Sequence, residues 1–146
     1  AKYVTGIDLY VDFDAIYGGL KSDNFRMIRG EILSPPDEVF DPAPNVVTST
    51  DVIEHFHKED GLKIIETYSN ILPRGGMMIT GSPSAYSLPY RSQRSKDSHF
   101  YEYEPLELKT ELEKHFSRVF LFSMNDEVVH TGFEKLAWYF FLIAVK

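Results

Sequence analysis

The sequence contains no cysteine at all. Disulfide bonds, thiol nucleophiles and cysteine-based zinc sites are therefore excluded. The absence is compatible with a reducing compartment, and we expect a cytoplasmic protein.

Basic residues are also scarce. The chain has 15 lysines and arginines against 22 acidic residues, which gives a formal net charge of −7. A surface that binds nucleic-acid phosphates needs an excess of Lys and Arg. We therefore expect no broad nucleic-acid partner, and we interpret the most basic segment, YRSQRSK from Tyr90 to Lys96, as a solvated loop.

Long apolar runs are missing as well. The longest, LAWYFFLIAV from Leu136 to Val145, is too short to span a bilayer as a helix. Its aromatic and β-branched residues predict a buried strand. The first ten residues, AKYVTGIDLY, lack the apolar stretch of a signal peptide, so we expect no secretory leader and no membrane partner.

The remaining composition is ordinary for a globular protein, with 43% hydrophobic and 25% charged residues in 146. This length predicts a single domain over residues 1–146. Strand-like and helix-like segments alternate, which predicts an α/β fold with a largely parallel sheet. The expected strands are Tyr3 to Ile7, FRMIRGEI, NVVTST, MMITGSPS, RVFLFSMN and LAWYFFLIAV.

Three helices are expected between these strands. A weak one covers DFDAIYGGLKSD, and a longer one, DVIEHFHKEDGLKIIETYSNIL, begins at Asp51 as its N-cap. The third, EPLELKTELEKHF, has Pro105 near its first turn, where proline is tolerated. We expect residues 83–103 to form a long polar and aromatic loop, a kind of segment that often has a function.

Ligands of parallel α/β sheets bind outside the carboxyl ends of the strands. Polar residues stand at several of the expected strand ends and would lie along one edge of the sheet. They are Asp8, Glu31, Ser49, Thr50, Asp51 and Ser82.

The segment TSTDVIEHFHKED contains the most reactive side chains. Asp51, Glu54 and His55 have the spacing of one helix face, which suits a divalent metal, and His99 would be a fourth ligand. Alternatively, Asp51 and Glu54 cap an ordinary helix. In a third interpretation, His55 or His99 is a general base. We predict Glu54, His55 and His99 as catalytic residues, assign no metal, and expect His57 at the surface.

Several segments, taken in order, resemble class I S-adenosylmethionine-dependent methyltransferases, which have a Rossmann-like fold. These segments are VTGIDL, FRMIRGEILSPP, NVVTSTDVIEH, ILPRGGMMITGSPS and HFYEYEPLELKTELEKHFSRVFLF. The last apolar strand is similar to the antiparallel C-terminal strand of that fold. The resemblance implies a mostly parallel sheet with one antiparallel strand, and S-adenosylmethionine as the cofactor.

The resemblance also implies roles for individual residues. Asp8 would accept hydrogen bonds from the ribose hydroxyls of the cofactor, and as an alternative it would only cap the next helix. Glu31 would accept a hydrogen bond from the adenine amino group, and Ile32 would pack on the ring or form a hydrogen bond to it. As an alternative, Glu31 would only be a solvated loop acid. Leu9, Ser49 and Thr50 complete the predicted cofactor-binding set.

One feature of the family is not found: a first strand followed by a glycine-rich loop. The resemblance begins at the family's second strand, so we expect an N-terminally truncated version of the fold. The chain would be a piece of a longer protein, or naturally short, or completed by a partner chain or a second copy that fills the gap.

The expected function is methyl transfer from S-adenosylmethionine to a small-molecule or glycan acceptor. A non-catalytic or partner-dependent methyltransferase-like module is one alternative. A metal-dependent RNA 3′-end 2′-O-methyltransferase is another, because some family branches have a pattern similar to Asp51, Glu54, His55 and His99. The acidic balance of the chain argues against that last possibility.

Overall fold

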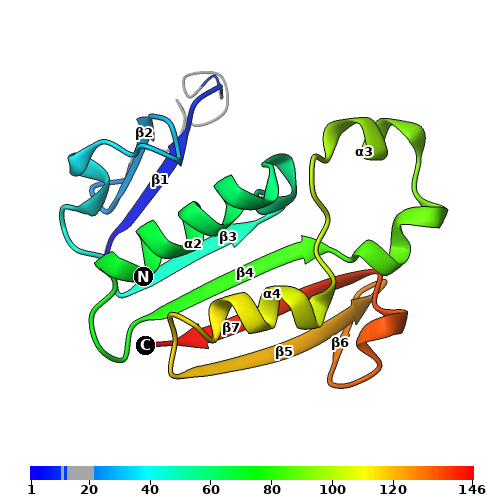
Figure 1. The fold of residues 1–146 in the computed structure, drawn as a ribbon. Coiled ribbons are helices and arrows are strands. Elements are labelled where there is room, and N and C mark those ends of the chain that lie inside the picture. Colours follow the sequence, from blue (N-terminus) through cyan, green and yellow to red (C-terminus); the bar gives the residue numbers. More distant parts are fainter. Residues whose placement is uncertain (11, 13–21) are drawn as a thin grey trace. The chain divides into compact units, whose positions relative to one another are not determined.

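A computed structural model of the protein describes residues 1–10, 12 and 22–146 (Figure 1). The chain forms two compact units, Ala1–Ala43 and Pro44–Lys146, and each is described by itself. The assignment of residues 1–146 to one domain stays a prediction. No helix in the described part of the chain is long and apolar enough to cross a membrane.

The first unit contains two parallel strands, β1 (Val4–Asp8) and β2 (Phe25–Arg29). Their register pairs Val4 with Phe25 and Asp8 with Arg29, so both strands end at the same edge. A short 3₁₀ helix, η1 (Asp37–Phe40), follows. Both expected strands are confirmed, whereas the expected weak helix over DFDAIYGGLKSD falls mainly outside the described residues.

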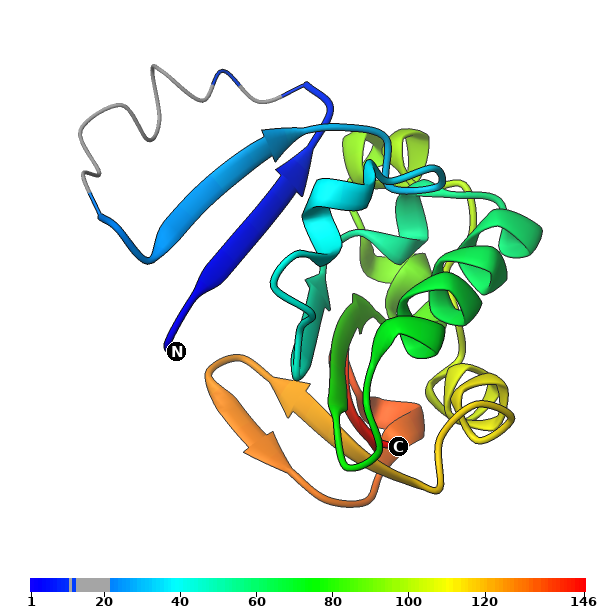
Figure 2. The same cartoon turned by 90° about the vertical axis from the view of Figure 1, so that its left-hand side faces the viewer.

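The second unit is built on a five-stranded sheet with the order β3-β4-β7-β5-β6 (Figure 2). The strands are β3 (Val46–Thr50), β4 (Met77–Pro83), β5 (Arg118–Asn125), β6 (Val128–His130) and β7 (Tyr139–Val145). β3 and β4 are parallel, and β7 is antiparallel to both β4 and β5. β3, β4 and β5 therefore run in one direction, and the expected antiparallel C-terminal strand lies between two of them.

Two helices, α2 (Lys58–Ile71) and α4 (Pro105–Leu112), cover one face of this sheet (Figures 1 and 2). The burial pattern of β7 is consistent with this one-sided cover, because every second residue is buried and the residues between them are half-buried. This period of two places one set of side chains against the helices. The core cluster comprises Ile53, Ile65, Leu72, Met78, Tyr103, Leu108, Leu112, Phe116, Phe140, Leu142 and Ala144.

The long helix expected from Asp51 is wrong in its first third. Asp51 has a left-handed backbone (φ 54°), a short 3₁₀ helix η2 (Ile53–His55) follows, and α2 begins only at Lys58. Asp51 is therefore not the N-cap; His57 occupies that position. Aspartate tolerates the left-handed region better than most residues, so the chain turns at Asp51 instead of continuing as a helix.

The expected loop over residues 83–103 contains two short helices. They are the 3₁₀ helix η3 (Ala85–Tyr90) and α3 (Gln93–Ser98). Ser84 and Ser92 cap them, because their hydroxyls accept hydrogen bonds from the backbone of Tyr86 and Ser95. Two further details differ: the last strand begins at Tyr139 and not at Leu136, and β6 and the 3₁₀ helix η4 (Glu134–Leu136) precede it.

Two leucines in α4 allow a direct test of this packing. Leu108 is fully buried, whereas Leu106 is 47% exposed. We expect Leu108→Ala to lower the free energy of unfolding by about 2–5 kcal/mol, because it leaves a cavity in the core. Leu106→Ala should cost less than about 1 kcal/mol. Urea unfolding measures both, and equal losses would contradict the assignment of the buried face.

Candidate functional site

The candidate site begins where β3 and β4 end. The register pairs Thr50 with Gly81, and the backbone N–H of Asp51 donates a hydrogen bond to the Gly81 carbonyl at 3.1 Å. The left-handed turn at Asp51 then leads directly into η2 at the end of the sheet. Of the predicted residues on β3, Ser49 is buried and Thr50 is exposed.

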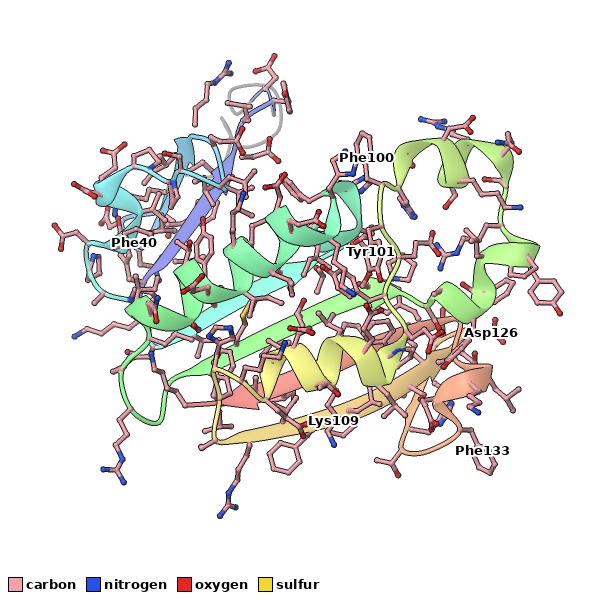
Figure 3. All side chains as sticks on the ribbon, viewed as in Figure 1. Phe40, Phe100, Tyr101, Lys109, Asp126 and Phe133 are labelled. Carbon is pink, nitrogen blue, oxygen red and sulfur yellow. The ribbon has the colours of Figure 1, made fainter. Side chains whose placement is uncertain are left out.

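Glu54, in η2, is the buried acid of the site. Its side chain is fully buried, and the Ser82 hydroxyl donates to Oε2 at 3.3 Å. Among the described residues, Oε1 has no hydrogen-bond partner. The Glu54 carbonyl accepts hydrogen bonds from the backbone of Phe100 (2.8 Å) and Tyr101 (3.2 Å), which lie on the segment between α3 and α4 (Figure 3). These bonds hold that segment against η2.

Burial raises the pKa of the Glu54 carboxyl above its ordinary value of 4.5. The charge of Asp51 acts in the same direction, whereas a backbone hydrogen bond, His55 and His99 act in the opposite direction. A buried carboxylate with an unpaired oxygen is costly, and proteins usually neutralise such a charge with a proton or a cation.

Two imidazoles lie next to this acid. The His55 and His99 rings meet edge to face, with 5.0 Å between their centroids. His55 Nδ1 is 2.8 Å from the Ser98 carbonyl, and His99 Nδ1 is 2.6 Å from Glu102 Oε1. Both partners are acceptors, so each Nδ1 is the donor, and in the neutral imidazole each Nε2 offers a lone pair.

Glu102 is itself held in place. It is 6% exposed, and Arg91 Nε lies 3.7 Å from its Oε2. The Arg91 guanidinium also donates to the Ser87 hydroxyl, at 2.6 Å and 3.0 Å. Polar contacts thus connect Ser87 to Arg91, Arg91 to Glu102, and Glu102 to His99. These contacts fix the orientation of the His99 imidazole.

Glu54, His55 and His99 can each offer one ligand atom, and these atoms all lie within 4.8 Å of one another. A carboxylate with two imidazoles is a donor set that suits a divalent transition metal. Hydrogen bonds from the second nitrogen of each histidine to fixed acceptors are typical of ligating histidines. These residues therefore fit a metal ion. Glu54 and His55 come from η2, and His99 comes from the segment that follows α3. The expected shared helix face is wrong, and Asp51 is not part of the group.

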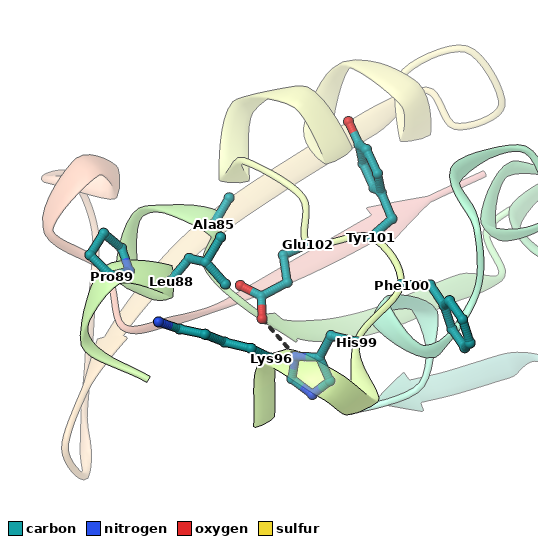
Figure 4. A pocket seen from close by; sticks show the side chains of 8 residues that line it. All are labelled: Ala85, Leu88, Pro89, Lys96, His99, Phe100, Tyr101 and Glu102. Carbon is teal, nitrogen blue, oxygen red and sulfur yellow. Dashed lines mark hydrogen bonds and ion pairs between the residues drawn. The ribbon is translucent and has the colours of Figure 1, made fainter. Parts of the chain in front are cut away.

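A cavity of about 500 Å³ lies beside His99 (Figure 4). Its walls come from η3, α3 and the segment before α4, so it belongs wholly to the second unit. Leu88, Phe100 and Tyr101 supply apolar surface, and Lys96 and Glu102 supply charge.

The predicted cofactor residues of the first unit gather at one end of β1 and β2. Asp8 Oδ1 accepts from the Tyr10 backbone at 2.8 Å, and the Asp8 carbonyl accepts from Gly30 at 3.1 Å. Glu31 Oε1 accepts weakly from the Leu33 backbone at 3.4 Å. Leu9 and Ile32 are half-buried beside these acids in the sequence. Two carboxylates at one strand edge fit a ligand rich in hydroxyl and amino donors.

Two residues near the site were not found from the sequence. Glu102 stands three residues after His99, a spacing that marks a possible histidine–carboxylate pair. Tyr139 belongs to a run that is expected only to be apolar. A Cβ on Gly81 would lie 2.7 Å from the Tyr139 hydroxyl, so only glycine allows this approach. Burial and the charges of Asp51 and Glu54 raise the Tyr139 pKa.

Comparison with solved structures finds the same architecture elsewhere. An O-methyltransferase family protein from Burkholderia thailandensis matches with a TM-score of 0.66 and 13% identity over 97% of this chain and 43% of that one. A possible histamine N-methyltransferase from Thermotoga maritima, described as SAM-dependent, matches with a TM-score of 0.71 and 15% identity. This match covers 97% of this chain and 72% of the Thermotoga protein. The chain has the class I methyltransferase fold.

This methyltransferase fold also matches HEN1, a small RNA methyltransferase, with a TM-score of 0.65 and 16% identity. That match covers 84% of this chain and 16% of the other, so the chain spans less than half of both HEN1 and the Burkholderia protein. No protein-family model matches the sequence, and no curated protein matches it. At these identities, the likeness establishes the methyltransferase fold alone.

The raised pKa of Glu54 predicts a pH dependence of stability. The folded state holds this proton more tightly than the unfolded state, so its stabilising effect is complete below pH 4.5 and is lost as the pH rises through the folded pKa. Glu54→Gln cannot lose the proton. With EDTA present, we expect its stability relative to the wild type to rise as the pH increases above 4.5.

Urea unfolding across this pH range provides the measurement. Glu66→Gln, which changes an exposed residue of α2, is the matched control and should show no such trend. A constant difference between Glu54→Gln and the wild type would show that burial does not perturb this carboxyl.

Proposed function

We propose that the chain belongs to an enzyme that transfers a methyl group from S-adenosylmethionine to a small-molecule or glycan acceptor. The observation that supports this most is the cluster of Glu54, His55 and His99 in a methyltransferase fold, at the edge where the parallel strands end. Solved proteins with this fold include SAM-dependent methyltransferases.

The cofactor supplies an electrophilic methyl group on a positively charged sulfur, which is displaced as the acceptor attacks. In this proposal, the Asp8 carboxylate binds the ribose hydroxyls, because an ionised carboxylate accepts several hydrogen bonds. Glu31 binds the adenine amino group, with Ile32 against the ring. Ser49 and Thr50 contribute backbone at the end of β3.

His99 is the proposed general base. Its Nε2 accepts the proton of the acceptor hydroxyl while the oxygen forms its bond to the methyl carbon. Glu102, 2.6 Å from Nδ1, orients the imidazole and stabilises the imidazolium that forms. His55 packs edge to face against the His99 ring and restricts its position.

Calorimetric titration with S-adenosylhomocysteine tests the cofactor assignment. We expect the wild-type chain to bind it, and we expect Asp8→Asn to weaken binding by about ten-fold or more, because an amide replaces an ionised acceptor. Asp23→Asn makes the same charge change at an exposed position of the same unit and should bind as the wild type does.

Equal affinities in the two variants would refute the role of Asp8. No binding to the wild type would favour the alternative in which the chain is a non-catalytic or partner-dependent module.

A second candidate is a metal-dependent transfer to the 3′-terminal ribose of RNA. It is favoured by the two histidines whose Nε2 atoms remain available beside the unpaired Glu54 Oε1. A divalent metal at this position would polarise a hydroxyl and lower its pKa. HEN1, which has the same fold, is a small RNA methyltransferase. The net charge of −7 opposes an extended RNA surface, so contact would be confined to the strand end.

Titration with Mn²⁺ separates the two candidates. If the metal site exists, His99→Asn should lower Mn²⁺ affinity by about a hundred-fold, and Glu102→Gln should lower it by about 10–100-fold through loss of its hydrogen bond to His99. His57→Asn is the matched control, since His57 is exposed and outside the cluster. Absence of Mn²⁺ binding to the wild type would leave the general-base mechanism.

A further inference from the structure

The cavity beside His99 has the size and the walls of a small-molecule site. Its volume of about 500 Å³ lies within the usual range for ligand pockets. Leu88 and Pro89 of η3 lie on one side, and Phe100 and Tyr101 lie on the other (Figure 4). Such walls favour an apolar, ring-sized body over a strongly hydrated one.

Three polar side chains, Lys96, His99 and Glu102, complete the lining, and His99 and Glu102 are already paired with each other. The Glu102 carboxylate binds His99 at 2.6 Å and faces Arg91 at 3.7 Å, so its charge is largely compensated inside the protein. Arg91, which is not part of the lining, also donates to the Ser87 hydroxyl and to the Trp138 carbonyl.

Lys96, on α3, is the exception. It lines the cavity and is half-buried, and no hydrogen bond or ion pair of its side chain occurs among the residues that the structure describes. Its ammonium group therefore gives this cavity one uncompensated positive charge. The acidic balance of the whole chain does not cancel it, because salt screens charges beyond about 10 Å.

We propose that this cavity binds the methyl acceptor, and that the acceptor is a small apolar, ring-containing molecule with an anionic group that binds Lys96. The anion is a carboxylate or a phosphate, and both pair with an ammonium group in the same way. The ring lies between Leu88 and Phe100, and the nucleophilic group of the acceptor faces His99. The identity of this ligand as the acceptor rests on the proposed function, whereas the anion site itself does not.

The test compares an acid with its neutral isostere. The probes are para-hydroxyphenylacetate, para-hydroxyphenylacetamide and phenyl phosphate, titrated into the full chain by NMR without any cofactor. We expect the acid to bind about ten-fold more tightly than the amide, with shifts in the backbone amides of residues 85–102. The tighter of the carboxylate and phosphate probes identifies the anion.

Lys96→Met should abolish this preference and leave amide binding unchanged, and Lys96→Arg should retain it. Arg94→Met is the matched control, because it removes one positive charge from the same helix at an exposed position outside the cavity lining. Circular dichroism verifies that each variant folds. Loss of the preference in both Met variants would attribute it to net charge and overturn the proposal.

Failure of the wild type to bind any of the three probes, or affinities for both anionic probes no higher than the affinity for the amide, would also overturn it. These outcomes are distinct from failure of the proposed function, which the titration with S-adenosylhomocysteine reports. Binding of S-adenosylhomocysteine without an acid preference would refute only the anion site. An acid preference without cofactor binding would oppose methyl transfer by this chain alone and leave an anion-binding cavity.

Discussion

The site depends on two hydrogen bonds, those that the Glu54 carbonyl accepts from the backbone of Phe100 and Tyr101. They join η2 to a segment far along the chain, and they place His99 edge-on to His55. The Glu54 side chain is buried in the same place, so backbone and side chain of one residue organise the whole cluster. Without these bonds the two imidazoles would belong to separate surface segments.

Keeping Glu54 in this position is unfavourable for stability. A fully buried carboxylate with one oxygen unpaired among the described residues forfeits hydration that the bond from Ser82 and a backbone hydrogen bond do not fully replace. An apolar residue would pack at this position at lower cost, as Ile53 does next to it. Perturbed acids that meet histidines in this way are concentrated at functional sites. The unfavourable burial is therefore an argument, independent of the fold, that the cluster has a chemical role.

The strands and the fold class were predictable because they follow from short-range patterns. The aromatic and β-branched run at the end of the chain predicts a buried strand, which is β7, and Pro105 begins α4 as its position in the sequence predicts. The turn at Asp51 was not predictable. The segment from Asp51 to Phe56 has a helical pattern, and only the contacts of η2 with the end of β4 and with Phe100 favour the left-handed turn.

The candidate site was predictable in its residues but not in its geometry. Glu54 and His55 are neighbours in sequence, so their proximity is local, whereas His99 reaches them through a tertiary contact that no periodicity encodes. The shared helix face expected for Asp51, Glu54 and His55 fails for the same reason: the helix begins only at Lys58. The contact between Arg91 and Glu102 depends on how the segment from η3 to α4 folds, so the sequence alone did not predict it.

The place of β7 in the sheet affects how this protein folds during synthesis. β7 lies between β4 and β5, yet the ribosome makes both of those strands first. Until residues 139–145 emerge, β4 and β5 each present an edge with unpaired backbone groups, and such edges recruit other chains. The nascent second unit would therefore pass through an aggregation-prone interval that ends only when β7 inserts, so its yield in cells should depend on chaperones that protect exposed strands.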